Sequence, residues 1–507
     1  MRVKCQDRWW MAVLLSVSSL GATGSDIGLV EAVKTANVDI VRALLQKTAD
    51  VNIPETDGTT ALHWAVQRDE LTTADLLIRA GANVGAANRY GVTPLSLACT
   101  NGSAAMIEML LKAGADPKTV LPEGETALMT AARTGKADAL KVLLAYGAEV
   151  NAKESWRGQT ALMWAAAERH PAAVRMLLAH GADIHARSKG GFTPLLFAVR
   201  VGDVDSIRAL VAAGASLNET ALDGTSLLML AIINAHYDLA AFLLDSGLDA
   251  NVEDPERGSA LHALAWVRCH DDRAACHSTL SDIVAPVPTG NLDSLALAKK
   301  LLERGANPNK RITWKAAPYS VQNGRVGKMP PTIAVGPQYL SLDGATPFYL
   351  ATKHADTALM RLLVAHGADP LLPTRQNITP LMAAAGLGFW EGEHPGTESQ
   401  ALAAVKLALE LGGDVNAVAD FGDSGVSDER WSGSTALHGA AARHANSIVQ
   451  FLADQGARLD LTTKAGWTPL TIVEGVFYGA QFKENPETAA RLRQLMSNAP
   501  SRSPQPK

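Results

Sequence analysis

The residues whose types and spacing could do chemistry lie mainly in one short segment. Cys269-His270 and Cys276-His277 form two Cys-His pairs with two aspartates between them. Thiolate, imidazole and carboxylate groups are ligands for transition metals, which makes a metal site one interpretation of the segment. The spacing matches no structural zinc pattern, because such sites usually use ligand pairs separated by two to four residues.

Two interpretations of this segment stay open. In an oxidising compartment, Cys269 and Cys276 could close a small disulfide loop. The alternative is an enzyme or metal site built from His, Cys and Asp residues of 262–277, with His394 as a further candidate ligand. Stoichiometric metal in the purified protein would separate the two.

A second segment has the sequence of a catalytic motif without its setting. Gly422-Asp423-Ser424-Gly425 looks like the motif around the nucleophile of trypsin-like proteases. The motif needs strands that bring a histidine and an aspartate to the serine, and none are evident, so we interpret it as a turn. The sequence contains no metalloprotease, P-loop or dinucleotide-binding fingerprint. We therefore predict no catalytic, cofactor-binding or metal-binding residue and no enzymatic activity.

Composition narrows the class of protein. The chain has 507 residues, of which 47% are hydrophobic and 19% charged, which excludes a largely disordered chain. The net charge of −5 argues against a nucleic-acid partner, because such binding needs clustered Lys and Arg. Aromatic residues are only 5%, and abundant Gly suits closely packed small helices.

The N-terminal 24 residues have the pattern of a secretory signal peptide. Basic residues at 2, 4 and 8 precede an apolar stretch over 9–22, and Ala22-Thr23-Gly24 offers a cleavage site. The apolar stretch is shorter than the ~20 residues that span a bilayer, although an uncleaved anchor is the alternative. We expect a periplasmic or secreted protein without a membrane span in the mature chain.

The strongest signal is an internal repeat of 33 residues. Gly91-Val92-Thr93-Pro94-Leu95 returns at 191–195 and at 466–470 as Gly-Phe-Thr-Pro-Leu and Gly-Trp-Thr-Pro-Leu. The aligned hydroxyl residue falls at Thr60, Thr93, Thr126, Thr160, Thr193, Ser226, Ser259, Thr346, Thr379, Thr435 and Thr468.

Each anchor of the repeat has a physical role. The Thr or Ser caps the first helix, and the Pro or Ala that follows fits the first helical position. A Gly after the second helix can take the left-handed conformation that ends it. We therefore expect two short helices and a turn in every unit.

This pattern resembles the ankyrin repeat, whose signature is T-P-L-H-x-A over 33 residues. The segments most similar to it are Thr60–Ala65 (TALHWA) and Thr435–Ala440 (TALHGA). The resemblance implies an all-α ankyrin-repeat solenoid of about twelve units, each with a helix-turn-helix and a β-hairpin finger. In layout the chain resembles exported bacterial ankyrin-repeat proteins.

In this interpretation His63, His262 and His438 are structural residues that bond backbone between neighbouring repeats, and Cys99 is a buried apolar residue. The chain divides into a signal peptide (1–24), an N-terminal capping repeat (25–57), regular repeats (58–257), a repeat with two long insertions (258–343), a regular repeat (344–376), a repeat with two short insertions (377–432), a regular repeat (433–465), a C-terminal capping repeat (466–496) and a disordered tail (497–507).

The insertions are the main departures from the period. One insertion of each pair should lie between the two helices and the other in the finger before the next repeat. Long loops in a regular array are either tolerated or functional. Aromatic residues in the fingers suggest interface contacts, although they could equally pack onto their own helices.

In the ankyrin family, fingers and first helices line a concave face that binds other proteins. By position, that face should include the ends of the first helices, such as Gln67, Thr100, Asn101, Glu168 and Asn234. The partner-binding candidates are Arg68, Tyr90, Arg133, Phe192, Arg200, Trp314, Tyr319, Tyr339, Trp390 and Trp431. We predict a monomeric, non-enzymatic scaffold for an unidentified protein partner, with specificity set by the insertions at 268–292 and 310–343. A purely structural spacer is a third class.

Overall fold

The computed structural model describes residues 28–47, 50–268, 288–313, 342–387, 397–421, 429–475 and 484–498, together with the backbone of 276–277, 319–322, 325–328 and 394–395. The chain forms two compact units, 1–149 and 150–507. The division falls inside the block of regular repeats at 58–257, where the sequence period gives no sign of it. Across the described segments, every helix is too short or too polar to cross a bilayer.

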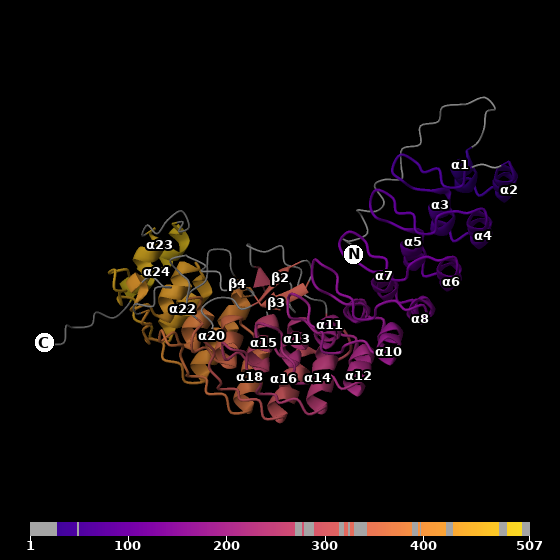
Figure 1. Ribbon diagram of the computed structural model, residues 1–507. Helices are drawn as coiled ribbons and strands as arrows, with labels where there is room; N and C mark the ends of the chain where they lie inside the picture. Colours follow the sequence, from indigo (N-terminus) through magenta and orange to yellow (C-terminus); the bar gives the residue numbers. More distant parts are fainter. Residues whose placement is uncertain are drawn as a thin grey trace. The chain divides into compact units, whose positions relative to one another are not determined.

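The first unit is a stack of helix pairs (Figure 1). First helices contact first helices of the next repeat, and second helices contact second helices. The pairs are α1 (Leu29–Lys34) with α2 (Val38–Gln46), α3 (Ala61–Gln67) with α4 (Leu71–Arg79), α5 (Pro94–Asn101) with α6 (Ala104–Lys112), and α7 (Ala127–Thr134) with α8 (Ala137–Ala145).

The second unit continues the same pairing, as Figure 1 shows for the segments coloured magenta to yellow. Its pairs are α9 (Ala161–Ala167) with α10 (Pro171–Ala179), α11 (Pro194–Val201) with α12 (Val204–Ala212), α13 (Leu227–Ile233) with α14 (Tyr237–Asp245), α15 (Ala260–Val267) with α16 (Ser294–Glu303), α17 (Pro347–Lys353) with α18 (Thr357–Ala365), α19 (Pro380–Ala385) with α20 (Glu398–Glu410), α21 (Ala436–Ala442) with α22 (Asn446–Asp454), and α23 (Pro469–Val473) with α24 (Pro486–Asn498). A short 3₁₀ helix, η2 (Glu429–Trp431), precedes α21.

The expected anchors start and stop these helices. The Thr93 hydroxyl accepts a hydrogen bond from the Ser96 backbone N–H at 3.2 Å, which caps α5. Pro94 occupies the first turn of the same helix, where no N–H is needed. Gly102 then ends it with φ +69°, and a Cβ there would meet the Lys136 side chain at 2.2 Å, so only glycine fits.

An asparagine staple joins successive second helices, a link that the repeat pattern did not predict. The Asn251 amide donates to the Gly305 carbonyl at 2.9 Å, and its side-chain oxygen accepts from the Asn307 N–H at 2.8 Å. Asn309 makes the same two bonds with Gly367 and Asp369. These bonds satisfy backbone groups left open where each second helix ends.

The insertions leave the regular frame in place. Ile312 donates its N–H to the Ala345 carbonyl at 3.1 Å, and Gly344 donates to Ile312 at 2.7 Å. Asn88 and Val92 close an uninserted finger with a bond of the same kind at 3.0 Å. The long finger insertion therefore grows from the hairpin tip and keeps the closing bonds. The other long insertion lies between α15 and α16, as expected.

Short strands occur only in the inserted segments of the described chain. Strand β2 (Tyr319–Gln322) pairs antiparallel with β3 (Arg325–Lys328), and β1 (Cys276–His277) pairs antiparallel with β4 (His394–Pro395). Regular fingers contribute isolated bridges such as Val120 with Thr126. At the C-terminus α24 runs to Asn498, so the tail predicted to be disordered from 497 begins later, since the Ser497 hydroxyl bonds the Gln494 carbonyl.

Candidate protein-binding surface

Three histidines hold the frame on which any binding residues sit. His63 Nδ1 accepts from the Thr60 N–H at 3.2 Å, and His63 Nε2 lies 3.0 Å from the Val92 carbonyl of the next finger. An N–H can only donate and a carbonyl can only accept, so the proton is on Nε2. His262 and His438 make the equivalent bonds, which confirms the structural role predicted for all three.

In the first unit, the predicted surface residues are exposed on the fingers and at the ends of the first helices. Arg68 donates from Nε to Glu70 at 2.6 Å and from a terminal nitrogen to the Lys34 carbonyl at 2.9 Å. The ring of Tyr90 is 49% exposed, with the Arg89 guanidinium 5.2 Å from its centroid. Arg133 is also exposed.

In the second unit, two predicted residues meet in one cluster. The Arg200 guanidinium carbon lies 5.1 Å from the centroid of Phe192 and 4.7 Å from that of Phe197. The two rings are 5.5 Å apart. Phe192 comes from a finger and the other two from α11, so finger and helix together place a half-buried cation on two aromatic faces.

Trp431 is a correction. We predicted an interface residue, but its side chain is only 5% exposed and packs edge-on against Trp467, with ring centroids 5.4 Å apart. The 3₁₀ helix η2 turns it inward, because two large apolar rings gain more from mutual burial than from solvent exposure.

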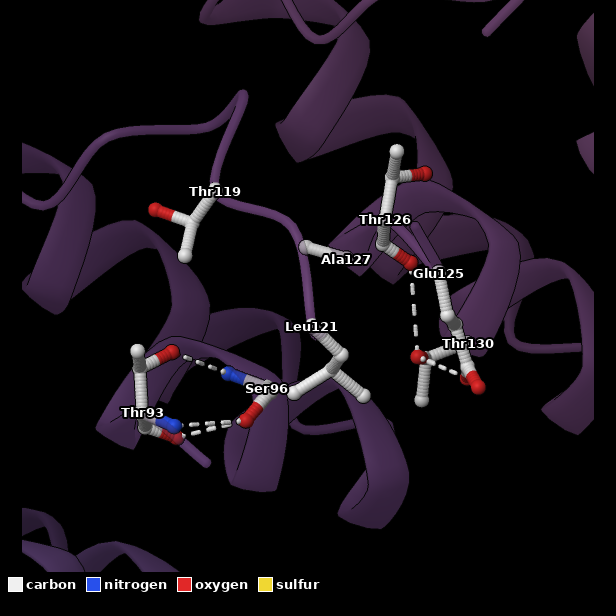
Figure 2. A pocket seen from close by; sticks show the side chains of 8 residues that line it. All are labelled: Thr93, Ser96, Thr119, Leu121, Glu125, Thr126, Ala127 and Thr130. Carbon is white, nitrogen blue, oxygen red and sulfur yellow. Dashed lines mark hydrogen bonds between the residues drawn. The ribbon is translucent and has the colours of Figure 1, made fainter. Parts of the chain in front are cut away.

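A small hollow lies between the repeats that begin at Thr93 and Thr126 (Figure 2). Leu121 and Ala127 line it, and the Thr130 hydroxyl donates to the Glu125 carboxylate at 2.7 Å. The hollow is no larger than about one water molecule, so it offers no site for a substrate or cofactor.

Comparison with known proteins places this geometry. A family model described as ankyrin repeats (3 copies) matches residues 29–120, 110–188 and 183–254, and a model of the single ankyrin repeat matches 343–375 and 432–464. Together the matches cover more than half of the chain. The chain belongs to the ankyrin repeat family.

A solved structure and the curated proteins give less. The crystal structure of the human ASB11 ankyrin repeat domain is 28% identical, and the match covers 40% of this chain and 90% of that chain, with a TM-score of 0.37. No curated protein matches the chain. The family resemblance and the all-helical repeat fold inferred from the sequence are confirmed, and ankyrin repeats act in general as protein-interaction scaffolds rather than enzymes.

Several predicted site residues of these ankyrin repeats lie outside the described residues. They are Trp314, Tyr339, Trp390, Cys269 and the 422–425 motif. Tyr319 and Cys276 are described only as backbone, in β2 and β1. The predicted disulfide between Cys269 and Cys276 therefore stays a prediction.

The register of β1 and β4 joins the two inter-helix insertions. His277 is the direct antiparallel partner of His394, and Cys276 is the partner of Pro395. Directly opposite residues of an antiparallel pair share one face of the ribbon. The alternative metal interpretation had drawn on the same two histidines. Among the residues with described side chains, no cluster of three or more metal-binding groups occurs.

The ankyrin repeat that begins at Ser226 departs from its neighbours because an insertion covers it. Thr289 donates its N–H to the Ala235 carbonyl at 3.1 Å and its hydroxyl meets His236 Nδ1 at 2.8 Å. Strand β3 also lies beside α13. Asn234, which we expected on the exposed face, is only 7% exposed and donates to the Leu230 carbonyl. This part of the expected binding face is occupied by the chain itself.

One exposed aromatic residue escaped the sequence analysis. Trp156 is 68% exposed, and the Arg157 guanidinium lies 4.1 Å from its ring centroid. The interval from Thr126 to Thr160 is 34 residues instead of 33, and this finger holds the extra residue. That single-residue lengthening was the signal that could have found the position.

Proposed function

We propose that this protein is a non-enzymatic scaffold that binds a protein partner, outside the cytoplasm, through the fingers and first-helix ends of its ankyrin repeats. The observation that carries the proposal is the division of each first helix into two sets of residues. In α3, Ala65 and Val66 are fully buried, while Gln67 and the adjoining Arg68 are exposed. Packing fixes the first set, so the second is available for contacts.

Export is the second part of the proposal. Its support is the basic and then apolar sequence of the first 24 residues, which has the composition of a signal peptide. A reporter that is active only after export, fused to residues 1–60, should give signal in cells. Signal equal to that of a fusion starting at residue 28 would contradict export.

The binding surface can be tested with two matched pairs of substitutions. The test variant R68A/R133A removes exposed cations from the first-helix ends. The control R79A/K112A removes exposed cations from second helices, where each pairs with an acidic residue one turn away. Cross-linking and capture from the exported fraction should recover a partner with the native chain and the control, and clearly less with the test variant. Equal recovery with both variants would place binding elsewhere.

The long finger has its own experiment. A chain in which 314–341 is replaced by a short turn keeps the Ile312–Ala345 bonds. Loss of the partner from this chain would support the proposal that the insertions set specificity, and full retention would remove the finger from it. A chain lacking 422–428 is the control, since the ends of that loop are closed in the same way by Ala419 and Ser434.

A second candidate function is metal binding between the two inter-helix insertions. The backbone pairing of His277 with His394 favours it, because two cross-strand histidines can donate to one metal ion. Equilibrium dialysis with Zn²⁺ should give one bound ion per chain, and H277A and H394A should each abolish binding. Binding that neither substitution weakens would overturn this candidate.

A further inference from the structure

Two neighbouring fingers of the second unit carry a concentrated positive charge. We call the surface formed by Lys153, Trp156, Arg157, Arg187 and Lys189 the basic finger patch. All five side chains are exposed. They come from the finger before α9 and the finger before α11, which are consecutive in the chain.

Hydrogen bonds between the fingers hold the patch together. Lys189 donates its backbone N–H to the Arg157 carbonyl at 2.7 Å and its Nζ to the Ser155 carbonyl at 2.5 Å. Lys153 Nζ donates to the Arg187 carbonyl at 3.1 Å. The cations of each finger thus reach across to the backbone of the other, which fixes their spacing.

A buried carboxylate makes the first finger rigid. Glu154 is 6% exposed and accepts hydrogen bonds from the N–H groups of Trp156, Arg157 and Gln159 at 2.6 to 2.9 Å. Its charge is directed into the loop and stabilised by amides rather than by the cations on the surface. The loop therefore presents Trp156 and Arg157 in one conformation.

The cations of the patch have no carboxylate partner. Lys153, Arg157, Arg187 and Lys189 form no ion pair with any described residue, and the bonds of Arg187 are to the Gly191 and Thr220 carbonyls.

Elsewhere, finger cations are neutralised by side chains. Arg375 meets Asp343 at 3.1 Å and Lys464 meets Glu429 at 2.5 Å. Only the basic finger patch, among these fingers, leaves its positive charge for another molecule.

Trp156 adds an apolar contact to this charge. Its indole is 68% exposed on a rigid loop, and exposed tryptophans beside arginines are the residue types that dominate binding energy at protein interfaces. The combination fits a ligand with carboxylates next to an apolar side chain. A polyanion such as nucleic acid fits less well, because the chain as a whole carries a net charge of −5.

We propose that the basic finger patch binds an acidic segment of a partner protein. Carboxylates of that segment pair with Arg157, Arg187 and the two lysines, and an apolar side chain beside them packs on Trp156. This inference rests on the proposed scaffold function and names the chemistry of its partner.

The direct test is binding of a fluorescent 12-residue peptide of alternating Glu and Leu to the full chain, measured by anisotropy. We expect binding that weakens as salt rises, at least about tenfold weaker binding by R157E/K189E, and unchanged binding by the control R79E/K112E. The substituted side chains are exposed, and equal melting temperatures of the two variants would verify their folding.

Three results would overturn the inference. They are equal binding of a peptide in which Lys replaces Glu, equal binding by R157E/K189E, and tighter binding of a 12-nucleotide single strand than of the acidic peptide. The natural partner separates this inference from the scaffold function. Retention of that partner by R157E/K189E, together with its loss from R68A/R133A, would reject the basic finger patch and leave the scaffold standing.

Discussion

His262 Nε2 lies 3.0 Å from the backbone oxygen of Lys310, although 48 residues separate them. In the regular repeats the same bond joins residues 29 apart, His63 with Val92 and His438 with Trp467. The insertion between α15 and α16 has therefore not displaced the next finger. Burial lowers the pKa of His262 to about 3 and that of His438 to about 4.

These buried histidines should make stability depend on pH. The unfolded chain binds a proton at each histidine below a pKa of about 6.5, while the folded chain binds it only below about 3 or 4. Stability is thus fully present above pH 6.5 and falls as pH decreases toward the folded pKa. We expect each histidine to contribute about 2 kcal/mol of lost unfolding free energy between pH 7 and pH 5.

The measurement is urea unfolding at pH 7 and pH 5. H262Q should shrink the difference between the two pH values by about 2 kcal/mol, since glutamine keeps a donor but does not titrate. The same substitution at exposed His366 is the control. An unchanged difference in H262Q would mean that His262 is not neutral in the folded chain.

Gly439 should resist substitution although it lies inside a helix. Alanine normally stabilises a helix interior relative to glycine. Here a Cβ would lie 2.5 Å from the Leu387 backbone N and 2.9 Å from its Cα, because α21 packs closely on the end of the preceding first helix. We expect G439A to lower the unfolding free energy by about 1–3 kcal/mol. Gly28 has open space around it, so G28A should change little; a stabilised G439A would disprove the close contact.

Two tryptophans should separate stability from binding. W431A should destabilise the fold by about 3–5 kcal/mol, because it empties the buried space against Trp467. W156A should leave the melting temperature within about 1 °C, because its ring is 68% exposed. Thermal unfolding of both variants is the measurement, and a stable W431A would show that the ring is dispensable for packing.

Arg268 and Asp356 form a mostly buried ion pair at 2.6 Å that links the end of α15 to the start of α18. R268M should cost about 3–5 kcal/mol, because it leaves Asp356 without its cation. The control is R304M, which breaks an exposed pair with Asp245 of the same length and should cost less than about 1 kcal/mol. Similar losses in both variants, by denaturant unfolding, would contradict the difference in burial.

The accuracy of the sequence analysis follows the range of the interactions. Helix starts such as Thr93 and ends such as Gly102 depend on atoms within a few residues, so the pattern located them. Asn234 and Trp431 were wrong because chain segments from other repeats or from an insertion bury them. Trp156 was missed because one inserted residue, not a motif, makes it protrude. Exposed candidates such as Arg68 were placed correctly because repeat position alone determines burial there.

The bonds that close the long finger, from Ile312 to Ala345 and from Gly344 to Ile312, use backbone atoms only. No side chain of the insertion is needed to form them, so the sequence between these residues can vary without disturbing helix packing. A change of partner then requires new loop residues but no new core. The hairpin tip is for this reason a natural grafting point, where an unrelated peptide could be installed with its two ends already held at hydrogen-bonding distance.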